Sequence, residues 1–131
     1  MRHYFLDTNV VIDYLTQRQP FWPDSADLMQ TSLEGQTRLY VASLSFANIY
    51  YTLRRASTAA KAKAVVTELA QLVEVVGVDA SIIQQALASS FSDFEDGIQH
   101  FAALSVPAIT AIVTRDRKDF QTSFLPVMSP A

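Results

Sequence analysis

The chain has 131 residues, of which 50% are hydrophobic and 18% are charged. This balance excludes an intrinsically disordered chain, and the length predicts one folded domain over residues 1–131. The formal net charge of −3 argues against a strongly basic nucleic-acid-binding protein, although Arg54 with Arg55 and Arg115 with Arg117 form local basic clusters.

The absence of cysteine excludes disulfides and thiolate metal sites. No apolar run reaches the length of a transmembrane helix. A strand that starts almost at the first residue leaves no room for a signal peptide. We therefore expect a cytoplasmic protein that does not associate with a membrane.

The chain begins with an apolar run over residues 3–6 that ends abruptly at Asp7. Such a run predicts a buried strand, and we expect Thr8 or Asn9 to cap the helix that follows. Asp13 is expected to be a solvated acid of this helix. Because Asp7 ends a strand at a strand-to-helix turn, it lies where open α/β sheets bind ligands. The structural alternative is that Asp7 only hydrogen-bonds the turn.

The middle of the chain alternates helices with strands. Pro23 suits the first turn of a helix that ends at Gly35. The apolar residues of that helix, among them Leu28 and Leu33, are expected to form either an interface or core. Next come a strand over 38–42, helices over 43–55 and 58–72, a strand over 74–78, and a helix to residue 89 that Asp79 or Ser81 caps.

In the last third of the chain, Ser92 and Glu95 have the spacing of a capping box. They predict a helix that runs to about residue 105 and stops before Pro107. An apolar strand over 109–114 follows, and a short edge strand is expected over 125–128. Strands that alternate with helices favour a three-layer α/β/α sandwich with a four- to five-stranded parallel sheet, whose strands end at one edge.

Acidic residues are expected to converge at that edge. Asp7 follows the first strand, Asp116 follows the fourth, and Asp96 lies in the first turn of the helix between the third and fourth strands. Asp93 lies one turn before Asp96, and Asp119 lies shortly after Asp116. A carboxylate cluster without His or Cys suits Mg²⁺ or Mn²⁺ rather than Zn²⁺. Such an ion lowers the pKa of a bound water and neutralises charge on a phosphate, as phosphoryl transfer requires.

Each of these acids also has a structural explanation. An acid at a helix start complements the helix dipole, an Asp after a strand is a common turn former, and Asp93 competes with Ser92 for the cap. Thr114 is a candidate to hydrogen-bond the carboxylates. His100 lies four residues after Asp96, and we expect it to be a packed or surface histidine rather than a metal ligand.

Three motifs occur in a fixed order: Asp7-Thr8-Asn9 after a first strand, Asp96 near a helix start, and Thr114-Arg115-Asp116 with Asp119-Phe120 after a later strand. This set resembles the PIN-domain nucleases, which include the VapC-type toxins of bacterial toxin–antitoxin pairs. The resemblance covers nearly the whole chain. It implies a parallel sheet between helices, Mg²⁺ or Mn²⁺ as cofactor, and cleavage of single-stranded or structured RNA. It also implies a homodimer and an antitoxin protein as partner.

The resemblance places metal-site acids at Asp7, Asp96 and Asp116, with Asp119 as a further candidate. The family usually has another acid, a Glu, on the helix after the second strand. The matching residue here is Asn48, and no acid occurs between residues 39 and 60. Because an Asn offers a carbonyl oxygen but no charge, we expect the site to bind metal more weakly.

The sequence therefore predicts a metal-dependent endoribonuclease in which Arg115, Arg55 and Thr114 contact the RNA beside the acids. The alternative, which Asn48 supports, is a catalytically weakened domain that binds RNA or protein. A third class, the aspartyl-phosphate phosphatases and receiver domains, is disfavoured. A phosphatase of this kind needs an acid two residues after the first one, and here that residue is Asn9.

Overall fold

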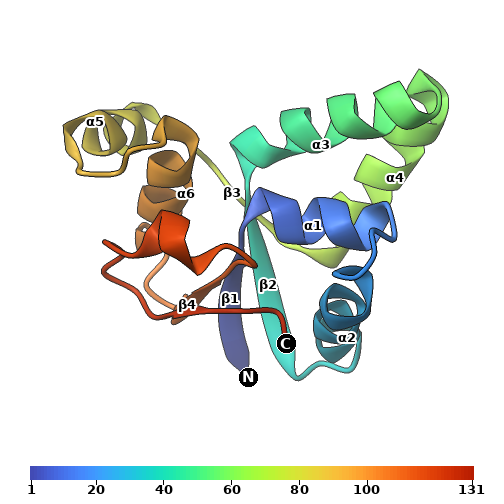
Figure 1. Cartoon of the computed structure of the whole chain (residues 1–131), viewed down its shortest axis with the longest axis horizontal. Coiled ribbons are helices and arrows are strands. Elements are labelled where there is room, and N and C mark those ends of the chain that lie inside the picture. Colours follow the sequence, from blue (N-terminus) through green and yellow to red (C-terminus); the bar gives the residue numbers. More distant parts are fainter.

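A computed structural model describes all residues from 1 to 131 (Figure 1). It contains five strands, six α-helices and one short 3-10 helix. In chain order these are β1 (Arg2–Leu6), α1 (Thr8–Leu15), α2 (Trp22–Leu33), β2 (Thr37–Ala42), α3 (Ser43–Ala56), α4 (Ala59–Leu72), β3 (Glu74–Val76), α5 (Ala80–Ala88), α6 (Phe94–Leu104), β4 (Ala111–Val113), η1 (Arg117–Phe120) and β5 (Val127–Met128). Every predicted element is present, although β3, β4 and β5 are shorter than predicted.

The five strands form one sheet in the order β3-β2-β1-β4-β5, and all neighbouring strands are parallel. The first strand of the chain is therefore the central strand of the sheet. Helices α1 to α4 lie on one side of the sheet and α5 with α6 on the other, as Figure 1 shows. The predicted three-layer α/β/α sandwich with a parallel sheet is confirmed.

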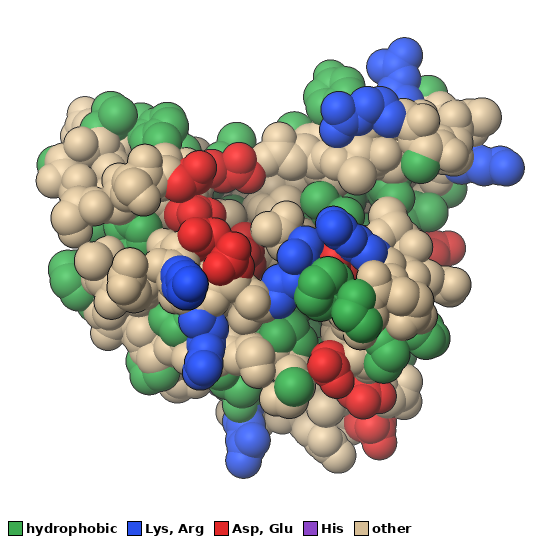
Figure 2. Space-filling view, in the orientation of Figure 1, with side chains coloured by type: hydrophobic (Ala, Val, Ile, Leu, Met, Phe, Trp, Pro, Cys, Tyr) green, Lys and Arg blue, Asp and Glu red, His purple; other side chains and the backbone are tan.

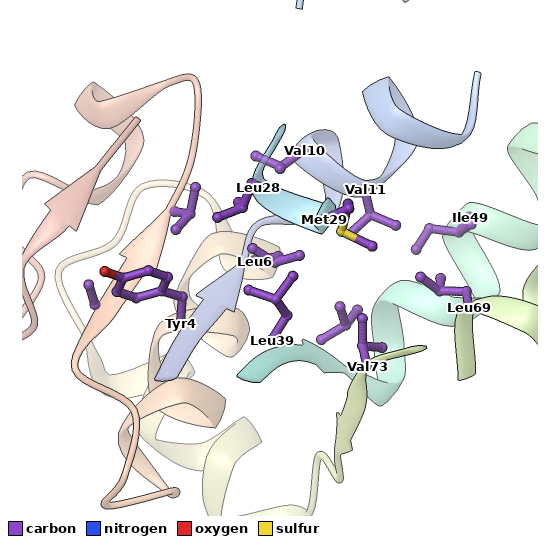
Figure 3. Close-up of a cluster of buried hydrophobic side chains, with 13 residues drawn as sticks. Tyr4, Leu6, Val10, Val11, Leu28, Met29, Leu39, Ile49, Leu69 and Val73 are labelled. Atoms are coloured by element: carbon purple, nitrogen blue, oxygen red, sulfur yellow. The ribbon is translucent and has the colours of Figure 1, made fainter. Parts of the chain in front are cut away.

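Alternation along the central strand divides the core into two clusters. Tyr4 and Leu6 of β1 pack on the side of α1 to α4, whereas Phe5 between them packs against α5 and α6. Figure 3 shows the first cluster, in which Leu6 of β1 lies near Leu39 of β2 under the helices. Because residues buried on both faces of a sheet are all apolar, the buried part of β1, Tyr4 to Leu6, shows no alternation of polarity in the sequence.

The apolar residues of α2 are partly in the core and partly exposed. Leu28 and Met29 are buried in the first core cluster, whereas Leu33 is 63% exposed. The core explanation therefore holds for the central residues of α2. No helix of the structure is both long and apolar enough to cross a lipid bilayer.

Two of the predicted helix caps are wrong. Asp7, rather than Thr8 or Asn9, is the N-cap residue of α1, and its side chain makes no capping bond because other groups hold its oxygens. Helix α6 is capped by Asp93, whose Oδ1 accepts a hydrogen bond of 2.9 Å from the backbone N–H of Asp96. The capping box of Ser92 and Glu95 does not form.

Candidate functional site

A cavity of about 320 Å³ opens at the carboxyl end of the central strand. Asp7 and Thr8 form its floor, Asn48 of α3 lines one side, and the start of α6 lines the other. Figure 2 shows the acidic side chains gathered along a hollow between the two halves of the molecule. Its polar lining residues are Asp7, Thr8, Asn9, Asn48, Asp93, Glu95, Asp96, Gln99 and Asp119.

Asp7 is held from two sides. Its Oδ1 accepts a hydrogen bond of 3.1 Å from Nε2 of Gln99, and its Oδ2 accepts one of 2.8 Å from Oγ1 of Thr114. Only 3% of Asp7 is exposed. Burial raises the pKa of Asp7, and the bonds from Thr114 and Gln99 oppose that rise because they stabilise the ionised form. The carboxylate is therefore fixed in one orientation at the bottom of the cavity.

Gln99 ties the floor of the cavity to α6. Its Oε1 accepts hydrogen bonds from the backbone N–H of Thr8 at 3.1 Å and from Oγ1 of Thr8 at 3.2 Å. Oγ1 of Thr8 in turn lies within hydrogen-bond distance, 2.7 Å, of Oγ of Ser45 at the start of α3. Gln99 is not among the residues predicted for the site, although it lies three residues after Asp96 and so shares a face of the helix with it.

The acids along the wall of the cavity raise one another's pKa values. Partial burial, followed by the charges of Asp93 and Asp7, raises the pKa of Asp96 to about 7. The pKa of Asp119 is also raised, by its local burial and by the neighbouring carboxylate of Asp116. Carboxylates that repel one another in this way gain stability when a cation lies between them.

Asn48 and Glu95 meet across the cavity. Nδ2 of Asn48 donates a hydrogen bond of 2.7 Å to Oε1 of Glu95. The pKa of Glu95 is raised, first by partial burial, while this bond acts in the opposite direction. From the sequence, Glu95 is predicted only to cap its helix. The contact joins residues 47 positions apart, so no local pattern signals it.

The structure gathers four of the predicted site residues around the cavity: Asp7, Asn48, Asp96 and Asp119. Thr114 lies directly beneath Asp7, and its Oγ1 also accepts a hydrogen bond of 3.1 Å from the backbone N–H of Asp116. Asp116 itself is exposed beside Asp119, at the start of η1, and does not line the cavity.

The two candidate arginines lie outside the cavity. Nε of Arg115 pairs with Oδ2 of Asp13 at 2.8 Å, and its guanidinium lies 4.3 Å from the centre of the Phe21 ring. The prediction of a solvated Asp13 is therefore wrong, because Arg115 covers it and leaves it 2% exposed. Arg55 is exposed near the carboxyl end of α3, where its charge complements the helix dipole.

His100 belongs to the core, which is one of the two positions expected for it, packed or on the surface. It is fully buried among aromatic rings, and its Nε2 accepts a hydrogen bond of 3.0 Å from the backbone N–H of Phe124. Burial lowers its pKa to about 4, so the ring is neutral at pH 7 and contributes no charge to the cavity.

The oxygen donors of the cavity fit a hard divalent ion. Its acids and amides offer only oxygen ligands, which Mg²⁺ and Mn²⁺ prefer. Asp7, Asp96 and Asp119 are the residues that would hold such an ion, with Asp116 next to them. As the side chains stand, no three acidic groups are placed to bind one ion together, so binding requires the exposed side chains to turn inward.

Comparison with known proteins agrees with this fold. The family model described as "PIN domain" matches residues 3–118. A comparison with curated proteins gave no match. The chain therefore belongs to the PIN-domain family of nucleases, because the match spans most of its length.

Several solved structures of toxin–antitoxin proteins share the fold. VapBC-1 from nontypeable Haemophilus influenzae has a TM-score of 0.70 and 18% identity, and the match covers 98% of both chains. A toxin–antitoxin complex from Klebsiella pneumoniae has a TM-score of 0.69 and 15% identity over 98% of both chains. VapC20 from Mycobacterium tuberculosis, described as a sarcin–ricin loop cleaving toxin, has a TM-score of 0.69 and 16% identity, covering 93% of this chain and 96% of the other. The fold is thus that of the VapC-type toxins.

Proposed function

We propose that this chain is a metal-dependent endoribonuclease and the toxin of a toxin–antitoxin pair, built as a single cytoplasmic domain over residues 1–131. The observation that carries the proposal is the cavity in which the fixed carboxylate of Asp7 faces Asp96 and Asp119. It lies at the carboxyl edge of a parallel sheet, where folds of this class bind ligands.

Asp7, Asp96, Asp116 and Asp119 are the residues we assign to the metal. When bound, Mg²⁺ or Mn²⁺ lowers the pKa of a coordinated water and offsets the charge that develops on a phosphodiester. Thr114 and Gln99 orient Asp7 and favour its ionised form, because both donate hydrogen bonds to its carboxylate.

For the RNA strand we propose Arg55 as a phosphate contact, since its side chain is exposed on α3. Arg115 is bound to Asp13 and stacked on Phe21. We therefore assign it an indirect role, which is to fix the turn between Thr114 and Asp116. Its remaining N–H groups are a secondary candidate for contact with RNA.

Cleavage of RNA by purified wild-type protein and by Asp7→Asn tests the assignment. We expect the wild type to cleave single-stranded RNA in the presence of Mg²⁺ or Mn²⁺ and the variant to lose cleavage, because Asn cannot supply the charge of Asp7. Asp27→Asn on the exposed surface of α2 is the matched control and should cleave like the wild type. Undiminished cleavage by a pure Asp7→Asn protein would refute the assignment.

A second candidate function is a domain that binds RNA or protein without cleaving RNA. It is favoured by Asn48, which stands where the family usually has a charged ligand. This alternative predicts RNA binding that persists in EDTA, whereas a metal-dependent nuclease loses productive binding on chelation.

The partners we propose are an antitoxin protein and a second copy of the chain. The antitoxin is supported by relatives that were solved as VapBC or toxin–antitoxin complexes. Light scattering of the isolated protein measures its oligomeric state. Co-purification with the product of an adjacent gene would test the antitoxin, and a lack of any such complex would count against it.

A further inference from the structure

The two sides of the acidic cavity are joined by one side-chain hydrogen bond between α3 and α6. Nδ2 of Asn48 on α3 donates a 2.7 Å hydrogen bond to Oε1 of Glu95 on α6, and both residues are partly buried and line the cavity. Figure 1 shows that these helices lie on opposite sides of the carboxyl end of β1. The contact therefore brings a carboxylate from one helix to the place where the other helix carries an amide.

The two residue types are complementary. An amide nitrogen can only donate, and an ionised carboxylate can only accept, so Asn48 stabilises Glu95 in its charged form. A Glu at position 48, which the family resemblance leads one to expect, would instead place two carboxylates against each other. Like charges at that distance repel unless one of them takes up a proton.

Glu95 is free to reach across the cavity because another residue caps its helix. Asp93 accepts the hydrogen bond from the N–H of Asp96, so the capping role that Glu95 has in a capping box is not needed here. With the backbone of the first turn fixed in this way, the side chain of Glu95 faces α3 and not the turn before it.

We propose that Glu95 supplies the fourth acid of the metal site from α6, and that Asn48 is the positioning residue that holds it there. The inference rests on the proposed metal-dependent function and deepens it. The negative charge that the family resemblance places on α3 is then carried by α6 in this chain. Asn48 is then a compensated exchange and not the mark of a decayed site.

Calorimetric titration of Mn²⁺ tests the exchange with three variants and a control. Glu95→Gln removes the charge at nearly constant shape, and Asn48→Ala removes the residue that holds it. The double variant Asn48→Glu/Glu95→Gln returns the acid to α3 and keeps a donor opposite it. Glu68→Gln, an exposed acid on α4, is the matched control. Thermal unfolding of the metal-free proteins shows whether each variant is folded.

We expect Glu95→Gln to weaken Mn²⁺ binding by about a hundredfold and Asn48→Ala by about tenfold, the lower end of the range for loss of an outer-sphere partner. The double variant should regain most of the lost affinity, and Glu68→Gln should bind like the wild type. A contact that serves only to strap α3 to α6 predicts lower melting temperatures with unchanged Mn²⁺ affinity.

Two results would overturn the inference while leaving the proposed function intact. One is a wild type that binds Mn²⁺ and cleaves RNA, together with a Glu95→Gln variant of equal affinity. The other is a folded double variant that binds no better than Glu95→Gln alone. A wild type that neither binds Mn²⁺ nor cleaves RNA would overturn the metal-dependent function itself, and this inference with it.

Discussion

Replacement of Gln99 by Met should destabilise the protein far more than a substitution that conserves the volume of a buried side chain normally does. Gln99 is 1% exposed, donates to Oδ1 of Asp7, and accepts two hydrogen bonds from Thr8. Met fills a similar volume but satisfies none of these groups. The buried N–H of Thr8 and one oxygen of Asp7 would lose their partners.

Each buried polar group left unpaired costs about 1–3 kcal/mol, so we expect the free energy of unfolding to fall by about 2–4 kcal/mol. For a domain of this size, 1 kcal/mol corresponds to roughly 3–5 °C in melting temperature. Urea unfolding at pH 7 measures the loss directly. Gln84→Met, at an exposed position of α5, is the control and should change stability by less than about 0.5 kcal/mol.

The loss should also depend on pH. Burial already raises the pKa of Asp7, and removal of the Gln99 bond raises it further, since that bond favours the ionised form. Asp7 then holds its proton more tightly in the native state than in the unfolded state. The stability therefore falls as the pH rises from the pKa of Asp7 in the unfolded state toward its pKa in the folded state. The deficit of Gln99→Met should therefore be smaller at pH 4 than at pH 7. A variant as stable as the wild type, or a deficit that does not change with pH, would refute this account of the Asp7 site.

Two further predictions concern the acids and the ion pair. Because the pKa of Asp96 is raised to about 7, protons compete with the metal at this residue. The Mn²⁺ affinity measured by calorimetry should therefore rise by up to about tenfold per pH unit below pH 7 and level off above it. An Mn²⁺ affinity that does not change between pH 5.5 and pH 8 would contradict this. Arg115→Met leaves the buried carboxylate of Asp13 unpaired, which should cost about 3 kcal/mol in urea unfolding at pH 7; a loss below about 1 kcal/mol would show that solvent replaces the arginine.

The sequence is sufficient to predict the fold because its signals are local. Apolar runs of strand length alternate with helical periodicity, and the first and fourth strands end at the polar residues Asp7 and Thr114. The gathering of Asp7, Asn48, Asp96 and Asp119 follows from topology, since the parallel strands end at one edge and α6 begins there. No contact between individual side chains is needed for that prediction.

The errors concern residues whose partners lie far away in the chain. Asp13 looks like a surface acid until Arg115, 102 positions later, covers it. Glu95 fits a local capping pattern, but the amide of Asn48 is the stronger partner, and Asp93 takes the cap. Periodicity and spacing carry no information about such pairs, because they report the neighbours of a residue along one element and not across the sheet.

The position of β1 in the middle of the sheet sets the order in which the site can form. On one side β1 pairs with β2, from which only α1 and α2 separate it in the chain. On the other side it pairs with β4 (Ala111–Val113), which comes much later. The hydrogen bond from Thr114 to Asp7 spans 107 positions, and such long-range closures form slowly. During synthesis, the carboxylate of Asp7 gains its hydrogen bond from Thr114 only after residues 111–114 have been made. A nascent or truncated chain that stops short of β4 carries Asp7 and Asp96 but lacks Thr114, which holds Asp7, and Asp119, which completes the lining of the cavity.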